Sequence, residues 1–301
     1  MKRFLIHITW FAIVVGLSIF CVFSLADGTS DPFYKRFTTP RQTSLVLGSS
    51  RAAHGIIPSI ISEELKIENG FNYAFTYNTS PYGEVYLNSI KKKLDTTSKN
   101  QLFILGVDPW VLSNKGDNPN DIDQFLEKNN FLGDLETVNS NPNFEYLIKS
   151  YSDPYIKILY NNTHVKLEDD GYLRTLINPS IEKIAINKGK TLEKYKRIPK
   201  LYKFSELRMS YLKETVNYFQ EYGDVYLVRI PIDLDFLELE DILKPDFDEL
   251  MNTFALQLDI EYFNFSKEGN SYSYSDGHHL LPDSAKELSL QIANKIKQSK
   301  E

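Results

Sequence analysis

Two short polar segments of the chain hold residue types that could perform nucleophilic catalysis. Residues 48–50 read Gly-Ser-Ser and follow a short apolar run, and residues 275–279 read Ser-Asp-Gly-His-His. A serine hydroxyl attacks an acyl group well only when a base removes its proton and a carboxylate orients that base. Asp276 and His279 are three positions apart, so a turn can bring both into one crevice. A serine of residues 48–50 together with Asp276 and His279 therefore predicts a nucleophilic unit.

Each of these residues also has an ordinary interpretation. A Gly-Ser-Ser turn can simply cap a helix, and His278 could be the base in place of His279 or only pack against the turn. Arg51 could bind an anionic substrate group or pair with an acidic neighbour, and we expect His54 to be a surface histidine. Asp276 with both histidines could bind a metal ion, but no further ligand stands at metal-site spacing. We therefore expect neither a metal ion nor a cofactor.

Five short apolar runs predict the strands that would position these groups. They cover residues 43–48, 71–75, 101–107, 224–230 and 260–265. Such runs suit buried strands of a parallel sheet. Apolar stripes at helical spacing alternate with them, over residues 87–94, 212–219, 247–258 and 285–296. Strand alternating with helix predicts an α/β fold whose parallel sheet is covered on both faces. Ligands bind such sheets at the carboxyl ends of the strands, where both polar segments stand.

Residues 112–203 interrupt this alternation between the third and fourth predicted strands. The segment is polar, rich in Asn, Asp and Tyr, and too long for a simple loop. We predict an inserted, partly helical cap over the site rather than a separate domain. Its second half carries a basic run of Lys183, Lys188, Lys190, Lys194, Lys196, Arg197, Lys200 and Lys203. This run is either a solvated helix face or a patch for lipid headgroups or an anionic polymer.

The first residues of the chain form a candidate membrane anchor. After Lys2 and Arg3, residues 4–25 carry no formal charge apart from a possible one on His7, and the run is long enough to cross a bilayer. Positive residues ahead of such a run favour the cytoplasm, which predicts an extracytoplasmic position for the rest of the chain. A cleaved signal peptide is the alternative, because residues 24–26 resemble a cleavage site.

The predicted organisation has three parts. Residues 1–25 form a single-pass transmembrane anchor or signal segment, residues 26–42 a linker rich in Gly, Ser, Thr and Pro, and residues 43–301 an α/β domain. We favour the uncleaved anchor, because the apolar run exceeds the roughly 7–15 residues of a signal-peptide core.

Composition excludes several classes of protein. The chain has 301 residues, of which 42% are hydrophobic and 25% charged, as expected of a folded protein. Its formal net charge of −6 argues against general nucleic-acid binding. Cys21 is the only cysteine, which excludes a disulfide scaffold, cysteine-based zinc sites and thiol catalysis outside the N-terminal segment. The bulky Phe20 before it disfavours a lipoprotein anchor.

The two polar segments resemble those of a known superfamily. Residues 48–50 resemble the first block of SGNH (GDSL-like) hydrolases, and residues 276–279 resemble their last block, Asp-x-x-His. The resemblance spans about residues 43–295, and the insertion over residues 112–203 has no clear counterpart in it. The run of residues 45–58 is particularly similar to membrane-anchored relatives, which include the DltD-like proteins of teichoic-acid D-alanylation and the SGNH-like polysaccharide O-acetyltransferases. It implies a flavodoxin-like three-layer α/β/α sandwich with a five-stranded parallel sheet. It also implies Ser50 as nucleophile, His279 as base and Asp276 as the partner of that base.

The chain departs from the SGNH pattern where an oxyanion hole would form. Ser49 stands in place of the usual Asp of the first block, and Asn72 and Asn78 are the candidate donors where the second-block glycine is expected. Asp108 replaces the third-block asparagine, and an ionised carboxylate can only accept hydrogen bonds. Losing one such donor costs about 100–1000-fold in rate. DltD-like relatives also lack this asparagine and have a proline-containing segment there, so the departure favours that branch.

Three functions are compatible with these features. The leading hypothesis is an exported, membrane-anchored acyltransferase or esterase that acts on a cell-surface glycan or polymer, with a membrane-bound acyltransferase as a candidate partner. In it, Arg51, Asn72, Asn78, Asp108 and His278 are candidates for substrate or oxyanion binding. The second hypothesis is a non-catalytic SGNH-fold component of envelope polysaccharide biosynthesis. A secreted esterase of small substrates is the third, and the anchor and Asp108 disfavour it.

Overall fold

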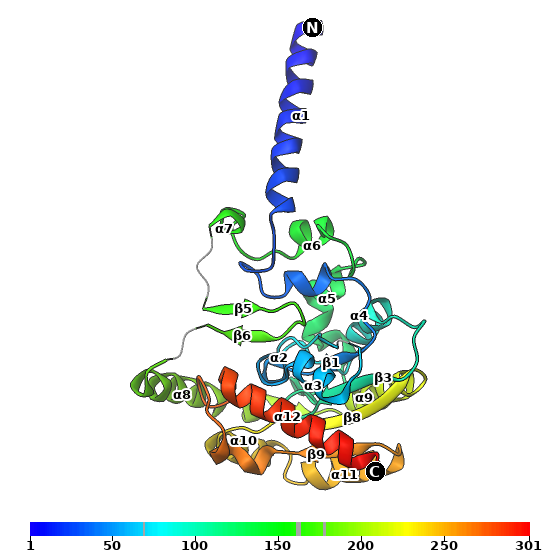
Figure 1. Cartoon of the computed structure of the whole chain (residues 1–301). Helices are drawn as coiled ribbons and strands as arrows, with labels where there is room; N and C mark the ends of the chain where they lie inside the picture. The colour runs from blue at the N-terminus through cyan, green and yellow to red at the C-terminus, as the bar shows by residue number, and fades with distance from the viewer. Residues whose placement is uncertain (69, 161–163, 177–178) are drawn as a thin grey trace.

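A five-stranded parallel sheet forms the centre of the molecule (Figure 1). The computed structural model describes residues 1–68, 70–160, 164–176 and 179–301. The strands lie in the order β2-β1-β3-β8-β9, and every adjacent pair runs parallel. Their bounds are β1 Leu45–Leu47, β2 Phe71–Asn72, β3 Gln101–Gly106, β8 Gly223–Arg229 and β9 Glu261–Asn264. The predicted α/β fold with five parallel strands is confirmed.

Helices cover both faces of this sheet. One face carries α2 (Ser50–Gly55), α3 (Pro58–Leu65) and α12 (Pro282–Ser299). The other carries α4 (Glu84–Lys93), α9 (Glu206–Gln220) and α11 (Phe247–Gln257). Successive side chains of a strand point to opposite faces, so Val46 joins the core of the first helices and Leu47 that of the second. Burial on both faces explains why the central parts of β1, β3 and β8 are apolar, while Gln101, Asp224 and Arg229 stand at or near strand ends.

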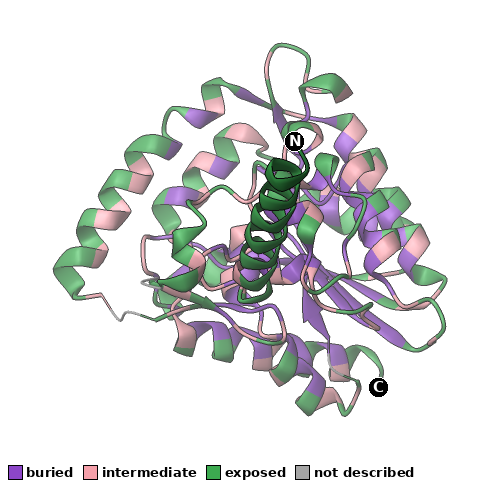
Figure 2. Ribbon diagram, turned by 90° about the horizontal axis from the view of Figure 1, so that it is seen from above, coloured by how far each residue is buried: buried purple, intermediate pink, exposed green. Residues whose placement is uncertain are grey.

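The helix α1 (Lys2–Ser24) projects away from the rest of the molecule (Figure 1). Figure 2 looks down on it and shows a helix exposed along its length above the buried strands. The helix has 23 residues and a mean hydropathy of 2.3 over its most apolar window. At 1.5 Å per residue it is about 35 Å long, enough for a hydrocarbon core of about 30 Å. It is therefore long and apolar enough to span a membrane once.

The segment after α1 is not the linker that its composition predicts. A single helical turn, η1 (Tyr34–Phe37), is packed into the domain. The side chains of Tyr34, Arg36 and Phe37 are at most 1% exposed. Arg36 Nε donates to the carbonyl of Asn72 (3.2 Å), and its Nη2 donates to that of Gly171 (2.9 Å). The Gly, Ser and Pro residues that suggested a linker only shape the turns, while the aromatic and basic side chains between them fix the segment to the core.

The inserted segment leaves and re-enters the domain through an antiparallel strand pair. These strands are β4 (Ser113–Lys115) and β7 (Tyr202–Phe204), with Ser113 opposite Phe204. Between them lie the short helices η2 (Ile122–Gln124), η3 (Leu126–Asn129), α5 (Phe131–Asp134), α6 (Phe144–Lys149) and α7 (Ile156–Leu159). The hairpin of β5 (Val165–Leu167) and β6 (Leu173–Thr175), the helix α8 (Ile181–Tyr195) and η4 (Ile198–Lys200) follow.

Only the second half of this insertion reaches the predicted site. The hairpin lies against α2, and α8 lies against α10 (Leu234–Leu243), a helix that follows β8. The first half packs elsewhere, because Leu132, Tyr146 and Leu147 belong to the main core on the face of α4 and α9. The expected cap over residues 112–203 is thus restricted to its last part, while α6 and α7 of the first part lie at the base of α1 (Figure 1).

Candidate active site

Ser50, His279 and Asp276 form a continuous chain of hydrogen bonds. The Nε2 atom of His279 lies 2.8 Å from the Oγ atom of Ser50. The Nδ1 atom of His279 lies 2.9 Å from Oδ2 of Asp276, and the backbone N–H of His279 donates to Oδ1 (3.0 Å). With its proton on Nδ1, the imidazole donates to the carboxylate and accepts from the serine hydroxyl. The structure therefore brings the three predicted residues together in the arrangement that activates a serine.

A sharp turn between β1 and α2 presents Ser50. Gly48 has φ of +149°, and a Cβ atom there would lie 2.5 Å from the Cβ of Ala52, so only glycine fits. Ser49 caps α2, because its hydroxyl accepts from the backbone N–H of Arg51 (3.3 Å). Ser50 is the first residue of α2, where no carbonyl of the helix can accept its backbone N–H. That N–H is free of the helix and can donate to a developing oxyanion.

A second turn presents His279 and Asp276. It is closed by the backbone N–H of Ser275, which donates to the carbonyl of His279 (2.9 Å). Gly277 has φ of +95°, and a Cβ atom there would lie 2.5 Å from the ring of Phe236 in α10. Burial alone would raise the pKa of the Asp276 carboxyl, but the hydrogen bonds and charge of His279 hold it well below its usual range. Asp276 therefore stays ionised at neutral pH.

His278 forms a wall of the site and does not reach the serine. Its ring is 5% exposed and packs against Tyr195 of α8 (centroids 5.1 Å apart), Phe236 (5.5 Å) and His279 (3.9 Å). Burial, followed by the neighbouring charge of His279, lowers the pKa of His278 far below its usual value, so this ring stays neutral. Of the two histidines that the sequence offered as base, His279 has the geometry.

His54 is a site residue that the sequence analysis placed wrongly at the surface. It is half-buried on α2, and its ring centroid lies 4.8 Å from that of His279. Its Nδ1 atom is buried without a hydrogen bond to any residue that the structure describes. Burial, followed by the charge of His279, lowers the pKa of His54 to about 3, so the ring is neutral. The sequence contains a pattern that predicts this position, because residues four apart, such as 50 and 54, lie on the same face of a helix.

A buried ion network lies beside Ser50. Arg51, 4% exposed, donates to Glu240 of α10, and its Nη1 atom lies 3.6 Å from Oδ2 of Asp108. Glu240 also accepts from Arg229 (2.8 Å), which in turn pairs with Asp248 (2.5 Å). Burial opposes the charge of Arg51, but Glu240 and Asp108 raise its pKa above the usual value. Of the two roles open to Arg51, the structure contains the pairing with acidic neighbours.

Asp108 is turned toward its own backbone. Its Oδ1 atom accepts from the N–H groups of Trp110 and Val111, both at 2.9 Å. Burial raises the pKa of this carboxyl, and Arg51 acts in the opposite direction. The residue therefore closes the turn after β3 and compensates part of the Arg51 charge. It brings no donor to the site while it is ionised.

Asn72 does not offer the oxyanion donor that the sequence analysis expected. The Nδ2 atom of Asn72 donates to the carbonyls of Ala52 (2.8 Å) and Ile56 (2.9 Å), which uses both amide hydrogens. Asn72 therefore ties β2 to α2. Asn78 is exposed, and its Oδ1 atom accepts from the hydroxyl of Tyr202 in β7 (3.0 Å). Among the expected donors, the backbone N–H of Ser50 and the amide nitrogen of Asn78 remain.

The same turn could also supply metal ligands. Ligand atoms of Asp276, His278 and His279 all lie within 4.8 Å of one another. Both ring nitrogens of His279 are already used, one by Asp276 and the other by Ser50. An ion bound through His279 would have to break one of these hydrogen bonds, so the arrangement fits proton transfer better than metal binding.

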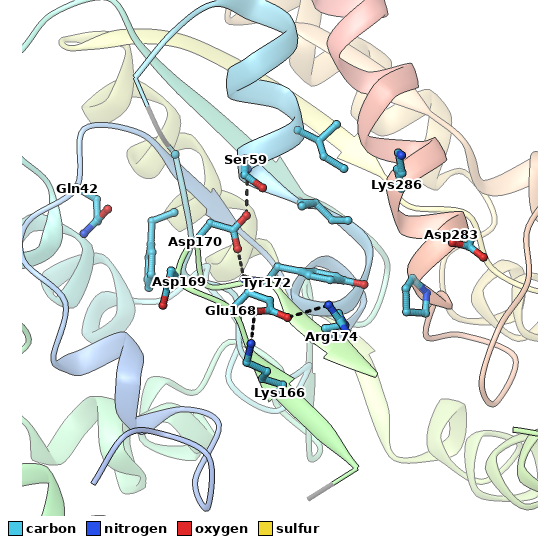
Figure 3. Close-up of a pocket in the computed structure, with 15 residues that line it drawn as sticks. Gln42, Ser59, Lys166, Glu168, Asp169, Asp170, Tyr172, Arg174, Asp283 and Lys286 are labelled. Atoms are coloured by element: carbon cyan, nitrogen blue, oxygen red, sulfur yellow. Dashed lines mark hydrogen bonds and ion pairs between the residues drawn. The ribbon is translucent and has the colours of Figure 1, made fainter. Parts of the chain in front are cut away.

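A separate pocket of about 690 Å³ opens beside the hairpin β5–β6, between α3 and the start of α12 (Figure 3). Its charged side chains are largely paired within the pocket wall. Glu168 pairs with Lys166 (2.8 Å) and Arg174 (3.3 Å), and Asp170 accepts from the backbone of Ser59 (3.0 Å). Ser50, Asp276 and His279 do not line it. This pocket is therefore not the place where the nucleophilic unit lies.

Neither a family model nor a curated protein matches this chain. The functional argument consequently depends on the geometry and charges of the site.

Proposed function

We propose that this chain is a membrane-anchored serine acyl-transfer enzyme of the SGNH type. The observation that carries the proposal is the hydrogen-bonded chain from Asp276 through His279 to Ser50. The strand order β2-β1-β3-β8-β9 is that of a flavodoxin-like doubly wound sheet. With helices on both faces, it supports assignment as the three-layer α/β/α sandwich that the Gly-Ser-Ser and Asp-x-x-His blocks imply.

The proposed reaction passes through an acyl-enzyme. The Oγ atom of Ser50 attacks the carbonyl carbon of the donor while His279 Nε2 takes its proton, and ionised Asp276 stabilises the imidazolium. The negative charge on the carbonyl oxygen is stabilised by the backbone N–H of Ser50. The bond to the leaving oxygen then breaks, and His279 protonates that oxygen. An acceptor hydroxyl attacks the acyl-enzyme in the same manner, returning the proton to Ser50; water in place of the acceptor gives hydrolysis.

The proposed substrate is a glycan or polymer made at the membrane surface. Because α1 would hold the domain at the membrane, the domain stays close to a substrate that is made there. Lys2 and Arg3 favour an extracytoplasmic position for the domain. The scarcity of side-chain oxyanion donors near Ser50 slows attack on unactivated esters. Transfer from an activated acyl donor, supplied by a membrane-bound acyltransferase, is consistent with such a site.

Labelling by a fluorophosphonate probe tests the proposal directly. The full chain in detergent should be labelled at Ser50, and neither Ser50→Ala nor His279→Ala should react. Ser49→Ala is the matched control, since it changes the neighbouring hydroxyl and leaves the hydrogen-bonded chain intact. Mass spectrometry of the labelled peptide locates the adduct. Equal labelling of Ser50→Ala and the unchanged chain would refute the catalytic assignment.

A second candidate is a non-catalytic component of envelope polysaccharide assembly with the same fold. The specific observation in its favour is the loss of donors, because Asn72 is fully used within the core and Asp108 only accepts. If this candidate is correct, Ser50→Ala should bind glycan as tightly as the unchanged chain. The fluorophosphonate probe should then label neither protein. Binding of cell-wall polymer fractions to both proteins, measured by calorimetry, separates the two functions.

A further inference from the structure

Two short helices of the insertion expose large apolar side chains on one side of the domain. We call Phe144, Ile148, Tyr155, Ile156, Leu159 and Tyr160 the α6–α7 surface. Ile148 is 70% exposed, Ile156 65% and Tyr160 75%. The opposite side of α6 is firmly held, since Tyr146 and Leu147 are buried and the Tyr146 hydroxyl donates to Asp31 (2.9 Å). The exposed side chains therefore stand on a fixed base.

This surface is continuous with the end of α1. Phe20 stacks on Phe144 with ring centroids 5.7 Å apart, and Phe23 lies 6.1 Å from the ring of Phe144 and 5.0 Å from that of Tyr155. Phe23 is only 5% exposed, so it joins the last turn of α1 to the domain. Figure 1 shows α6 and α7 at the base of α1, with α11 and β9 at the opposite end of the molecule.

These contacts fix the height of the surface relative to a bilayer. When a helix of about 35 Å spans a hydrocarbon core of about 30 Å, its last turn lies at the interface with the headgroups. Phe20 and Phe23 belong to that last part of α1, and they touch α6 and α7 directly. We propose that the α6–α7 surface inserts into the headgroup region of the leaflet in which α1 ends, so that the domain lies on the bilayer.

The charges of this segment identify apolar insertion as the binding mode. Glu145 pairs with Lys149 (2.8 Å) and Asp153 with Lys157 (2.7 Å), each four residues apart. The four charges sum to zero, which provides no attraction to anionic lipid. Tyrosine side chains, by contrast, are typical of membrane interfaces, where the ring is buried and the hydroxyl is hydrated. Lipid contact through this surface is therefore expected to be insensitive to salt and to anionic lipid.

Depth-dependent fluorescence quenching tests this placement. In a Cys21→Ser background of the full chain, a nitrobenzoxadiazole fluorophore is attached to a cysteine at position 148, 156 or 160. The proteins are placed in phosphatidylcholine nanodiscs with or without lipids that carry a nitroxide quencher near the headgroup. We expect the quenching lipids to reduce the fluorescence of all three labels, equally at low and high salt and with or without phosphatidylserine.

Two reference labels make the outcome unambiguous. A label on the native Cys21 reports the end of α1, and a label at position 256 reports Leu256, an apolar residue that is 82% exposed on α11 at the far end. Quenching at Cys21 and on the α6–α7 surface, but not at 256, supports the proposal. Quenching at Cys21 alone overturns it and leaves the surface for a protein partner or a second copy. Equal quenching at 256 also overturns it, because the domain then lies on the bilayer by another face.

Discussion

The rings of His54 and His279 lie against each other with centroids 4.8 Å apart and planes inclined by 49°. Both come from the crevice at the strand ends, and His279 is the residue that would accept the serine proton. Among the residues that the structure describes, His54 makes no hydrogen bond to Ser50 or Asp276, so we expect it to act through the ring of His279. We interpret it as a positioning residue that limits the rotation of the catalytic ring.

Replacement of His54 separates ring packing from imidazole chemistry. His54→Ala should reduce the rate of acyl transfer about 10-fold with little change in KM, because His279 loses the neighbour that holds its orientation. His54→Phe keeps a ring of similar size and should retain most of the rate. Steady-state acyl transfer at varied donor concentration, which gives kcat and KM separately, provides the measurement. Equal losses in both variants would show that the imidazole itself takes part.

Acid should destabilise the protein through His54. The pKa of this histidine falls from 6.5 to about 3 in the folded chain because the ring is buried. Between these values the unfolded chain binds the proton and the folded chain does not, so stability declines as the pH drops from about 6.5 toward 3. The decline amounts to at most about 1.4 kcal/mol per pH unit.

The pH series of Tm for the full chain in detergent tests this linkage. His54→Phe should flatten the acid slope, while replacement of the exposed His164 by Phe, the matched control, should leave it unchanged. His278 acts in the same direction, so part of the slope persists in His54→Phe. A slope identical to that of the unchanged chain would contradict the burial of a neutral His54.

The substitution Glu240→Ala should lower the free energy of unfolding strongly. This carboxylate lies between the guanidinium groups of Arg51 and Arg229 and is 1% exposed, so its loss leaves two buried cations with one carboxylate fewer. Breaking such a pair costs about 3–5 kcal/mol. Glu238→Ala on the exposed side of the same helix should cost less than about 0.5 kcal/mol. Denaturant unfolding of both variants makes the comparison, and equal midpoints would exclude a structural role for the network.

Asp276→Asn should abolish most acyl transfer and leave the fold intact. The amide has nearly the shape of the carboxylate but presents a donor to His279, which favours the wrong tautomer of the imidazole. Losses of about 10⁴-fold follow from this change in serine hydrolases. Asp283→Asn, an exposed position in the first turn of α12, is the control and should behave as the unchanged chain. Steady-state acyl transfer measures both, and activity near normal in Asp276→Asn would remove this carboxylate from the mechanism.

The strands and the turn that carries Asp276 and His279 are local features, and the sequence predicts them well. The strands β1, β3 and β8 are buried on both faces over most of their length, so each contains an apolar run that is visible in the sequence. The edge strand β9 is only partly buried and its run is interrupted by Glu261 and Asn264. The pair Asp276 and His279 lies within one turn, where spacing alone determines that the side chains meet. Ser50 was predictable in the same way, because a Gly-Ser-Ser turn follows directly on the run of β1.

The parts that sequence reasoning missed depend on distant partners. Glu240 is buried because it meets Arg51, which is 189 positions away along the chain, whereas Glu238 two positions earlier is exposed. Nothing local distinguishes these two glutamates. Asn72 is a similar case, since its amide is used by two carbonyls of α2 that only the packed fold places beside it. The composition of the segment containing Tyr34 and Phe37 predicts a linker, because Gly, Ser, Thr and Pro dominate it. The two aromatic side chains are nevertheless buried, because they pack against residues that are distant in the sequence.

The burial of Arg36 connects the anchor to the nucleophile. Arg36 follows α1 closely and donates to the carbonyl of Asn72, and the amide of Asn72 donates to two carbonyls of the helix that begins with Ser50. A domain on a flexible linker would move through a large volume above the bilayer, and the effective concentration of its serine near any one point would be low. A domain that is packed against the segment after its anchor instead keeps Ser50 at one distance from the bilayer and in one orientation. If the proposed acyl transfer is correct, the chain would modify only polymer that passes at that distance from the bilayer, and the spacing of acyl groups along a growing polymer would depend on how fast the polymer moves past.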